Sequence, residues 1–505
     1  MDTLLGWGCE SKQMKLLSAA LLCLFLILMV EGASCSMRLL KLSEFHAKLH
    51  QRVVYGPKGD LAAPVAPPGP DGAKKMGRVF YPVGYGGDPT GTQESSEAIL
   101  SALSDAFRVQ TKQQMLPGVS DLGGVILDLQ GGTYLVSKPI RFPASGGGNV
   151  VIQGGTLRAS ETFPNDRHLV ELWSPNSPGA DDQSTSYPKK VQNDRIYYED
   201  ITFRDILFDS SFQGGGIYVV ESARIRVADC FFLHFTTEGI LVKRGHETLI
   251  SRCFLGQHST VGADPGERNF TGTAIDLQSN DNAITDVVIF SAAVGIVLRG
   301  QANMVTGVHC YNKATYFGGI GILVKLAGLS QTRLDNCYMD FTGIVMEDPV
   351  QVHITNGFFL GDANIVLKSI KGQVSGLNVV NNMFSGDPQH MNPIVALDGQ
   401  FPNVNQVVVD SNNAIGMSLR STVGKLTVKG NGTKWIADFS SILLFPNQIN
   451  HFQYSFYAPG EVGFLKHAVT NVSNNVVVVE SEKAVNAVVS VVVDQYSMAG
   501  EVIQF

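Results

Sequence analysis

Five acidic residues in the middle of the chain carry the kind of side chain that general acid/base catalysis needs. Asp276 stands between aliphatic residues in "TAIDL", and Asp281 follows at the end of the same segment. Glu238 lies earlier, in "TTEGILV", and Asp264 and Glu267 lie between the two segments. Most enzymes that hydrolyse glycosidic bonds use two carboxyl groups, one as the acid and the other as the base or nucleophile. We therefore treat these five residues as candidate catalytic residues, with Asp276 first.

These carboxylates fall within and beside an internal repeat. Seven similar segments, each a short strand, a turn and a second strand, begin at aligned isoleucines: Ile217, Ile240, Ile275, Ile296, Ile322, Ile344 and Ile365. The intervals between the isoleucines are 23, 35, 21, 26, 22 and 21 residues. A period near 22 without helices is typical of a parallel β-helix, whereas leucine-rich repeats need a leucine and asparagine spacing that is absent, and propeller blades are about twice as long. The sequence thus predicts an all-β fold, a right-handed parallel β-helix that forms a single solenoid.

The repeat also predicts which side chains face outward. The residue after each aligned isoleucine points away from the core, and Asp276 is the single charged residue in that column of the seven segments. Two positions later, four of the seven outward residues are basic: Lys243, Arg299, Lys325 and Lys368. Such residues also keep exposed sheets from associating, but a row of cations suits a linear polyanion. We therefore expect Lys243, Arg299 and Lys325 to bind an acidic polysaccharide beside Asp276.

A catalytic partner for Asp276 must come from outside its column, which makes Glu238 and the other three acids the candidates. Asp281 has a simpler explanation, because Asp and Asn commonly form turns and it stands at an expected corner. His246 aligns with it in the preceding coil, and it is either a substrate ligand or proton carrier, or an ordinary turn residue. Asp286 falls on the second strand of its coil, away from the outward face that we expect to bind the polysaccharide, and is expected to be structural.

The repeat organises the rest of the chain. We expect a signal peptide over 1–36, a Pro/Gly-rich arm over 37–78, the β-helix over 79–390 and a C-terminal β region over 391–505. The apolar spacing of "SSEAILSALSDAF" (95–107) predicts a short amphipathic helix that caps the open end of the β-helix. Beyond residue 390, long valine runs between turn signals predict antiparallel hairpins that form a C-terminal cap.

The N-terminal segment has the features of a secretory leader. Lys12 and Lys15 precede the apolar run "LLSAALLCLFLILMV", and the small residues of "EGASCS" follow it. The run has 15 residues, fewer than the roughly 20 that cross a membrane, so no stable span is expected after cleavage. Three sequons fit the same route and are expected glycosylation sites: Asn269, Asn431 and Asn471. We therefore expect a secreted, extracellular protein.

Four cysteines remain after the leader, and the repeat places them in pairs. Cys230 and Cys253 each lie 13 residues after their isoleucine, and Cys310 and Cys337 lie 14 and 15 residues after theirs. Adjacent strands are about 4.8 Å apart, which suits a disulfide, but parallel side chains make its torsion awkward. Two disulfides and a buried ladder of thiols therefore both remain open. No histidine accompanies these columns, and we expect neither a metal nor another cofactor.

The charge of the chain limits its partners. The net charge of −7 leaves no basic excess with which to neutralise phosphates, so general nucleic-acid binding is not expected. We expect a monomer whose partner is a polysaccharide.

The segment that precedes the repeat resembles the opening of the pectate-lyase-like superfamily. The resemblance rests on "GGDPTGTQESSEAILSALSDAF" followed by "GGVILDLQGGTYLVSKPIRFP", in which a Gly-Asp segment, a helix and a Gly-Gly-Thr-Tyr strand turn lead into the β-helix. Together with the leader, the layout is most similar to the QUARTET-type plant polygalacturonases, which separate pollen tetrads by degrading pectin. The resemblance implies a parallel β-helix and hydrolysis of α-1,4-galacturonan (homogalacturonan) in the cell wall.

The site motifs of mainstream polygalacturonases carry over only in part. That family uses Asn-Thr-Asp, Asp-Asp, Gly-His-Gly and Arg-Ile-Lys motifs on successive coils. Here "TTEGILV" resembles the first motif and places Glu238 at its aspartate, while Gly272 and Thr273 stand where the Asp-Asp pair would fall. The segment "AAVGIVL" has no histidine, and Lys325 in "GILVK" matches the end of the last motif. Asp276 is then the candidate for a divergent version of the same chemistry.

Three functions are consistent with these features. The first is an inverting hydrolase of galacturonan with Asp276 as a catalytic carboxylate. The second is a pectate or other polyuronate lyase, which would need a Ca²⁺ site built from several carboxylates and an Arg or Lys base such as Arg299. The third is a cell-wall protein that binds pectin without cleaving it, which the missing family motifs favour.

Overall fold

The computed structural model of the chain describes residues 73–109, 111–175, 195–258, 270–312, 318–460 and 463–497. The expected signal peptide, most of the arm, and Asp264, Glu267 and Asn269 lie outside these residues. Within the described part, no helix is both long enough and apolar enough to span a membrane.

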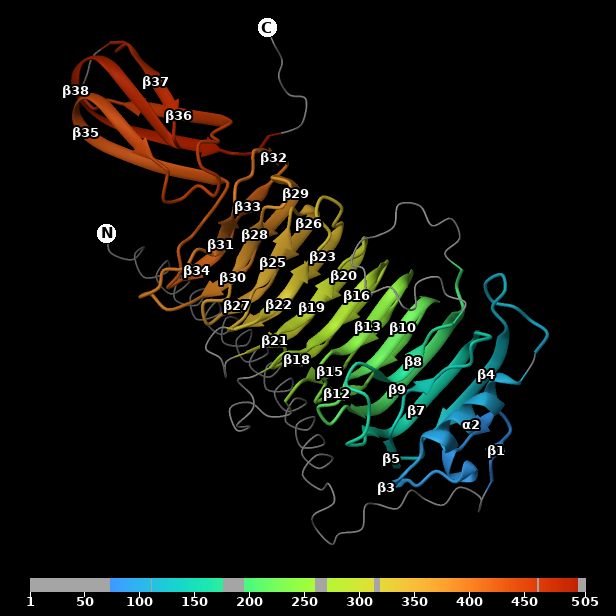
Figure 1. Ribbon diagram of the computed structural model, residues 1–505. Coiled ribbons are helices and arrows are strands. Elements are labelled where there is room, and N and C mark those ends of the chain that lie inside the picture. The colour runs from blue at the N-terminus through green and yellow to red at the C-terminus, as the bar shows by residue number, and fades with distance from the viewer. Residues whose placement is uncertain are drawn as a thin grey trace, which may run out of the picture. The chain divides into compact units, whose positions relative to one another are not determined.

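The chain winds into a right-handed parallel β-helix, as the repeat predicted (Figure 1). Each full coil adds one strand to each of three parallel sheets. The first sheet consists of β8 (His168–Leu172), β10 (Gly215–Ala223), β13 (Glu238–His246), β16 (Thr273–Asn280), β19 (Val294–Leu298), β22 (Ile320–Val324), β25 (Ile344–Glu347), β28 (Ile365–Lys368) and β31 (Val395–Asp398).

The other two sheets consist of shorter strands. The second sheet contains β11 (Arg226–Ala228), β14 (Leu249–Ser251), β17 (Ala283–Thr285), β20 (Asn303–Thr306), β23 (Thr332–Asp335), β26 (Val350–Thr355), β29 (Gln373–Val380), β32 (Asn403–Asn405) and β33 (Val408–Asp410). The third contains β12 (Phe231–Leu233), β15 (Phe254–Gly256), β18 (Val288–Phe290), β21 (His309–Tyr311), β24 (Tyr338–Asp340), β27 (Phe358–Leu360), β30 (Met383–Ser385) and β34 (Asn413–Ile415).

The register of the first sheet confirms the alignment of the repeats. Each of the first six isoleucines, from Ile217 to Ile344, pairs with the isoleucine of the next coil, and the seventh, Ile365, pairs with Val395. All seven are buried, because alternate residues of a strand point to opposite faces and these positions face the interior. The side chains one position later, Asp276 among them, therefore form the expected outward column.

Buried polar and sulfur side chains run through the interior beside the aliphatic core. Asn282 Nδ2 donates a hydrogen bond to Asn303 Oδ1 at 2.8 Å, so neighbouring coils share a buried amide ladder. The four cysteines of the β-helix are buried, free thiols: Cys230, Cys253, Cys310 and Cys337. Of the two arrangements that the sequence left open, the structure has the buried thiols. Burial raises the pKa of the Cys230 thiol, and its contact with Cys253 raises it further.

The N-terminal end of the β-helix is covered by the expected helix, α2 (Ser96–Phe107). Its buried face includes Ile99, Ala102 and Leu103, which pack into the same core as the coils. The remaining elements of this end are β1 (Lys75–Met76), β2 (Val79–Phe80), the 3₁₀ helix η1 (Pro82–Tyr85), β3 (Thr90–Glu94), β4 (Asp121–Asp128), β5 (Thr133–Val136), β6 (Ile140–Arg141), β7 (Gly147–Ala159) and β9 (Tyr198–Asp209).

The parallel coils continue beyond residue 390, where the sequence suggested that they fade, and end at Ile415. An antiparallel sheet follows, as expected, with β38 (Val476–Asp494) paired to β35 (Val423–Asp438), β36 (His451–Tyr457) and β37 (His467–Ser473). It has an apolar core of its own around Trp435 and Phe439. The sequon residues Asn431 and Asn471 are both exposed on this sheet.

Candidate active site

Asp276 lies in the outward column of β16 but is almost completely covered, with 5% of its surface exposed. Arg299, which follows β19, is its counter-ion. Arg299 Nε lies 3.0 Å from Oδ1 and 3.1 Å from Oδ2, and Arg299 Nη2 lies 3.0 Å from Oδ2. Gln278 Nε2 lies 3.4 Å from the same Oδ2. Asp276, which the sequence placed on the outer face, is therefore held by the guanidinium of Arg299 from the next coil.

Burial has the largest effect on Asp276 and raises the pKa of its carboxyl group. Arg299 lowers that pKa, the negative charge of Glu238 raises it, and the net result is a raised pKa. Desolvation disfavours the charged form of a carboxyl group, and a nearby like charge does the same. Asp276 is thus biased toward holding a proton.

Glu238 begins β13, the strand next to Asp276, where it pairs with Thr273. Its Oε2 atom lies 3.3 Å from Nε2 of His168, which comes from β8. Strand β10 lies between β8 and β13, and its residue at this level is Gly215. A Cβ atom at Gly215 would lie 2.5 Å from the His168 ring and 2.3 Å from the Glu238 carbonyl oxygen. The missing side chain therefore lets His168 reach across a whole strand to Glu238.

The surroundings of Glu238 lower the pKa of its carboxyl group, whereas those of Asp276 raise the pKa of that group. Burial alone would raise the pKa of Glu238, but the contact with His168 and the charges of His168 and Lys243 bring it below the ordinary value for a glutamate. Two neighbouring carboxyl groups whose pKa values move apart are the usual basis for an acid and a base in one site. Glu238 is the candidate partner whose charge acts on the pKa of Asp276, and its role as the second catalytic carboxyl group stays a prediction.

A second acid, Glu171 on β8, shares the column of Asp276. Glu171 pairs with Tyr218, Tyr218 with Leu241 and Leu241 with Asp276. Asp276 is the single charged residue of this column within the seven aligned segments, but the structure extends the column to Glu171, because the coil that contains β8 escaped the repeat. Glu171 is 1% exposed, so it is less accessible to a substrate than Glu238.

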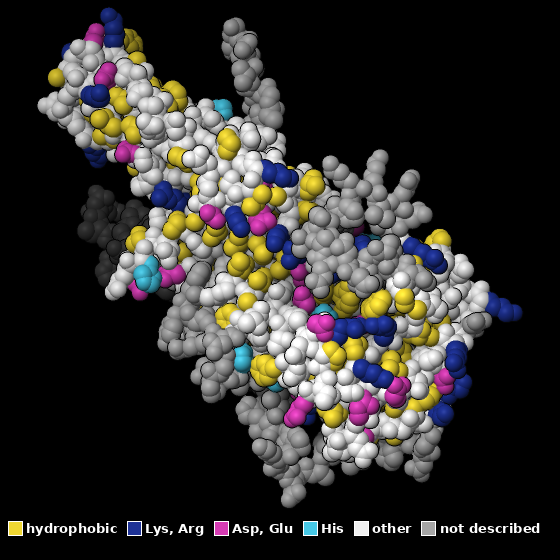
Figure 2. All heavy atoms as spheres, viewed as in Figure 1, with side chains coloured by type: hydrophobic (Ala, Val, Ile, Leu, Met, Phe, Trp, Pro, Cys, Tyr) yellow, Lys and Arg dark blue, Asp and Glu magenta, His cyan; other side chains and the backbone are white. Residues whose placement is uncertain are grey.

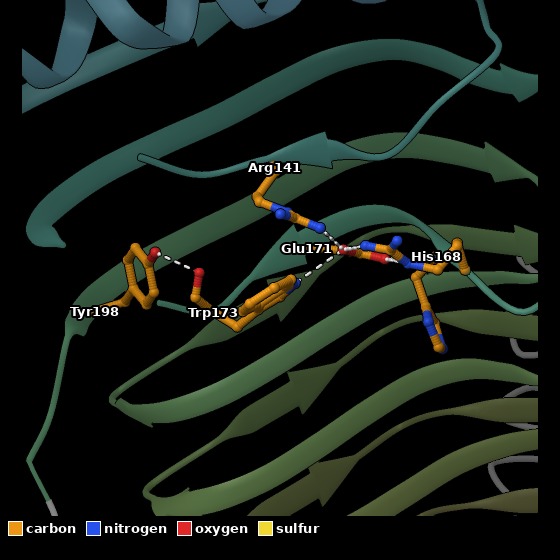
Figure 3. A network of polar contacts seen from close by, with 6 residues as sticks. Arg141, His168, Glu171, Trp173 and Tyr198 are labelled. Atoms are coloured by element: carbon orange, nitrogen blue, oxygen red, sulfur yellow. Dashed lines mark hydrogen bonds and ion pairs between the residues drawn. The ribbon is translucent and has the colours of Figure 1, made fainter. Parts of the chain in front are cut away.

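Glu171 is the centre of a polar network (Figure 3). Arg167 Nε donates to Oε1 at 2.8 Å and Trp173 Nε1 donates to Oε2 at 2.9 Å, while Arg141 Nη2 lies 3.7 Å from Oε2. Burial raises the pKa of Glu171, but these donors, Arg167 foremost, lower it overall. The His168 ring points away from this network toward the following strands (Figure 3). Glu171 thus stays ionised and fixes two arginines beside the site.

Aromatic rings lie next to these charges. The Arg141 guanidinium stacks 4.0 Å from the centre of the Trp173 ring. The Tyr218 ring packs 5.5 Å from that of His168, and Lys243 Nζ lies 5.6 Å from the centre of the Tyr218 ring. Aromatic rings combined with fixed cations provide both an apolar face and counter-charges for an acidic ligand.

The expected basic residues have different surroundings in the structure. Arg299 is paired with Asp276, and Lys368 Nζ lies 3.6 Å from Glu347 Oε1. Lys243 lies over Tyr218, and Lys325 is exposed at the end of β22. On the face that Figure 2 shows, basic side chains lie next to acidic ones. Arg299 and Lys368 are therefore not free cations, and substrate binding by Lys243, Arg299 and Lys325 stays a prediction.

Of the remaining candidate acids, the structure describes Asp281, and it is not brought to Asp276. Asp281 is exposed and has a φ of 58°, which places it at the corner after β16, as turn chemistry predicted. His246 ends β13 and pairs with Asn280, so its expected alignment with Asp281 is wrong by one residue, because the register shifts between Lys243 and His246. His246 and Asp281 both line a small hollow on that side of the coil. Asp286 also has a positive φ and is exposed at a bend between β17 and β18. Asp264 and Glu267 lie outside the described residues.

Five residues of the network around Glu171 escaped the sequence analysis: Arg141, Arg167, His168, Glu171 and Trp173. The aligned aliphatic residue of the coil that contains β8 is Val170, which precedes its partner Ile217 by more than twice the usual period. Arg141 lies one coil earlier, where it pairs with Glu171. The alternation in "HLVELW" is the signal that could have revealed this coil, with Glu171 one position after the aligned residue. Among the described residues, no group of three or more His, Cys, Asp or Glu side chains is arranged to hold a metal ion.

Comparison with known proteins gives one strong similarity. No protein-family model matches the chain. It is 51% identical over 433 residues to polygalacturonase QRT3 of Arabidopsis thaliana, and the match covers 85% of this chain and 87% of the relative.

Two solved structures align with the chain at low similarity. The surface adhesin PfbA of Streptococcus pneumoniae aligns with a TM-score of 0.46 and 12% identity, over 67% of this chain and 92% of the adhesin. The A-module of the mannuronan C-5 epimerase AlgE4 of Azotobacter vinelandii aligns with a TM-score of 0.41 and 12% identity, over 67% and 96% of the two chains.

Proposed function

Because the chain belongs to the family of polygalacturonase QRT3, we propose that it is a secreted glycoside hydrolase that cleaves the α-1,4-galacturonan of plant cell walls. The observation that carries the proposal is the pair Asp276 and Glu238, whose pKa values are shifted in opposite directions on adjacent strands. The apolar N-terminal segment and the exposed sequons at Asn431 and Asn471 support secretion.

A galacturonan chain binds along the outer face of the first sheet. Its carboxylates pair with Lys243, Arg299 and Lys325. Arg299 and Lys325 lie on successive coils, and the coil of Asp276, with Gln278 at this position, separates Lys243 from Arg299. Arg167 and Arg141, held by Glu171, extend the positive charge to the preceding coil. Arginine is well suited to this role, because its planar donors match a carboxylate.

Arg299 links substrate binding to the protonation of Asp276. In the free protein the guanidinium donates to both oxygens of Asp276. A substrate carboxylate competes for the same donors, and as Arg299 turns toward it, Asp276 loses its counter-charge. Burial then raises its pKa further, so the carboxyl group takes up a proton when the substrate arrives.

The reaction uses the two carboxyl groups in complementary roles. Glu238, ionised beside His168, takes a proton from a water molecule whose oxygen attacks the anomeric carbon. The bond from that carbon to the glycosidic oxygen breaks, and Asp276 gives its proton to the departing oxygen. One water molecule is consumed. Its hydroxyl group joins the anomeric carbon at one new chain end, and a proton joins the departing oxygen at the other.

The test is incubation of the purified mature protein with polygalacturonate, with and without a chelator. Reducing ends that appear without ultraviolet-absorbing unsaturated product are the expected result in both samples. Chelator-sensitive unsaturated product would replace the proposal with a lyase. Retardation of the protein in a polygalacturonate gel without any cleavage would leave binding as its activity.

A further inference from the structure

A polar hollow of about 540 Å³ opens on the second sheet, beside β23, β26, β29 and β33. Its volume falls in the range of ligand sites, roughly 300–1,000 Å³. The lining is dominated by amides with one guanidinium and one imidazole: Gln331, Gln351, Gln406, Asn378, Arg333 and His353. The hollow belongs to a different sheet from Asp276 and shares no residue with the candidate active site.

Strand register arranges these side chains in two columns. Arg333 pairs with His353, and His353 with Asn378, so the three face outward on successive coils. At the neighbouring corner, Gln331 and Gln351 have φ values of 41° and 55°. Left-handed corners of this kind repeat from coil to coil at strand spacing, about 4.8 Å. The coils therefore present amides as a ladder along the axis of the solenoid.

A glycine interrupts the ladder of corner amides and deepens the hollow. Gly376 takes the corner position of its coil with a φ of 63°, and the next coil has Gln406 at 51°. A Cβ atom at Gly376 would meet the Gln351 backbone at 3.4 Å. Because this corner has no side chain, the amides on either side flank a recess.

Several polar groups around the recess are held in place by each other. Gln331 Nε2 donates to Gln351 Oε1 at 2.8 Å, and Asn378 Nδ2 lies 3.0 Å from His353 Nε2. Arg333 is exposed and, within the described residues, has neither an ion-pair nor a hydrogen-bond partner. No carboxylate lines the hollow. The site thus offers fixed hydrogen-bond donors and acceptors with one uncompensated positive charge.

The segment that returns from the C-terminal sheet forms one wall. Tyr496 lines the hollow, and its backbone N–H donates to Asp494 Oδ1 at 2.7 Å. The next residue, Ser497, accepts a hydrogen bond from the Gln406 N–H at 2.8 Å and donates one from Oγ to the Val404 carbonyl at 3.1 Å. The C-terminal sheet therefore contributes a phenol ring to a hollow built on the coils.

We propose that this hollow is a non-catalytic binding site for an oligosaccharide segment that carries a carboxylate. The amides, His353 and the Tyr496 hydroxyl bond to sugar hydroxyls, and Arg333 pairs with the carboxylate. Because the lining contains no acid to donate or accept a proton, the bound segment is held and not cleaved. The inference rests on the lining of this hollow and does not depend on hydrolysis at Asp276.

Calorimetric titration of the full mature chain with trigalacturonate tests the site. The titrated protein carries Asp276→Asn, and reducing ends are followed in the same samples so that turnover is not mistaken for lost binding. Arg333→Gln should weaken one binding event by at least about 10-fold, because it removes a charged hydrogen-bond donor. Arg204→Gln is the matched control, since Arg204 is an exposed arginine of β9, which pairs with β11 of the second sheet on a distant coil, and it bonds to Gln153.

Two results would overturn the inference. One is unchanged binding of trigalacturonate to the Arg333→Gln protein. The other is a neutral cello-oligosaccharide that binds the parent protein as tightly as trigalacturonate does, with an affinity that Arg333→Gln leaves unchanged. The double variant Arg333→Gln, Asn378→Ala should not bind trigalacturonate at the hollow at all. It should unfold at the same temperature as the parent protein.

Discussion

His168 and Glu238 meet across the empty position at Gly215, with Nε2 of the imidazole 3.3 Å from Oε2 of the carboxylate. The two residues belong to strands that are not neighbours in the sheet. The contact lowers the pKa of Glu238 in a position where burial would otherwise raise it. The gap at Gly215 thus permits the contact that lowers the pKa of Glu238.

Asp276→Asn should lower the rate of galacturonan cleavage by about 10²–10⁴-fold, because it removes the proton donor. Retention in a polygalacturonate gel should persist, since Arg299 and Lys243 remain. The control is Asp281→Asn, which changes an exposed corner acid and should leave the rate unchanged. Full activity in Asp276→Asn would refute the assignment of this site.

His168→Gln should move the acidic limb of the kcat/KM profile to higher pH. His168 lowers the pKa of Glu238, so its removal lets that pKa rise, and Glu238 becomes protonated at pH values where it is now ionised. Activity at neutral pH should fall less than activity at pH 4 to 5. His246→Gln changes a histidine at the other end of β13 and should not shift the profile; an unshifted profile in His168→Gln would contradict the role given to this contact.

Arg299→Gln should destabilise the fold by about 3 kcal/mol near neutral pH, because it leaves a buried carboxylate without its partner. The pKa of Asp276 is already raised in the folded state, and it rises further when Arg299 is lost. Stability linked to this carboxyl group is complete below its unfolded pKa and is lost as the pH rises through the folded pKa. Urea unfolding of Arg299→Gln should therefore show greater stability at pH 4 than at pH 7.

The double variant Arg299→Gln, Asp276→Asn separates this electrostatic effect from lost packing. It has no carboxylate to ionise, so it should recover most of the lost stability at pH 7 and show a weaker pH dependence. If the double variant is as unstable as Arg299→Gln, the loss arises from packing and not from the unpaired charge.

Gly215→Ala should impair both stability and activity, since its Cβ would collide with the His168 ring and the Glu238 carbonyl oxygen. Overpacking of this kind typically costs 1–3 kcal/mol, and the shift of His168 should also move the acidic limb of the pH profile upward. Gly430→Ala on β35 is the control, because its nearest neighbour would be Trp435 Nε1 at 3.7 Å, an ordinary contact. The checks are the thermal unfolding temperature and the pH profile of both variants. Equal stability and equal profiles in the two would contradict the role given to Gly215.

His309 should make the protein less stable as the pH falls from about 6.5 to 4. Burial lowers the pKa of His309 to about 4, and its ring stacks on Tyr338 at 4.2 Å. The unfolded chain binds the proton near the ordinary pKa of 6.5 and the folded chain does not. Stability is therefore complete above pH 6.5 and declines by up to ~1.4 kcal/mol per pH unit below it.

His309→Phe keeps the stacked ring and removes the titration. Denaturant unfolding at pH 7 and pH 4.5 should show a smaller loss on acidification for this variant than for the parent. An equal loss in both proteins would show that other groups, and not His309, account for the acid sensitivity.

The repeating features of the fold could be predicted because they depend on local sequence. Aliphatic residues at Ile240, Ile275 and Ile296 recur at the length of one coil, and alternation along each strand then assigns Asp276 to the outer face. The helix over 95–107 and the late antiparallel hairpins followed from equally local patterns. The same logic missed β8, because a long interval separates Val170 from Ile217.

The sequence by itself determined the solenoid, the register of its coils and the outward position of Asp276, since periodicity is written into consecutive residues. The tertiary structure decided which charges meet: Arg299 with Asp276, His168 with Glu238, and two arginines with Glu171. Those pairings run across stacked strands and depend on side-chain length, on burial and on the gap at Gly215. The strength of an ionic contact and the pKa shifts that follow are set by distance and desolvation, and both exist only once the coils are stacked.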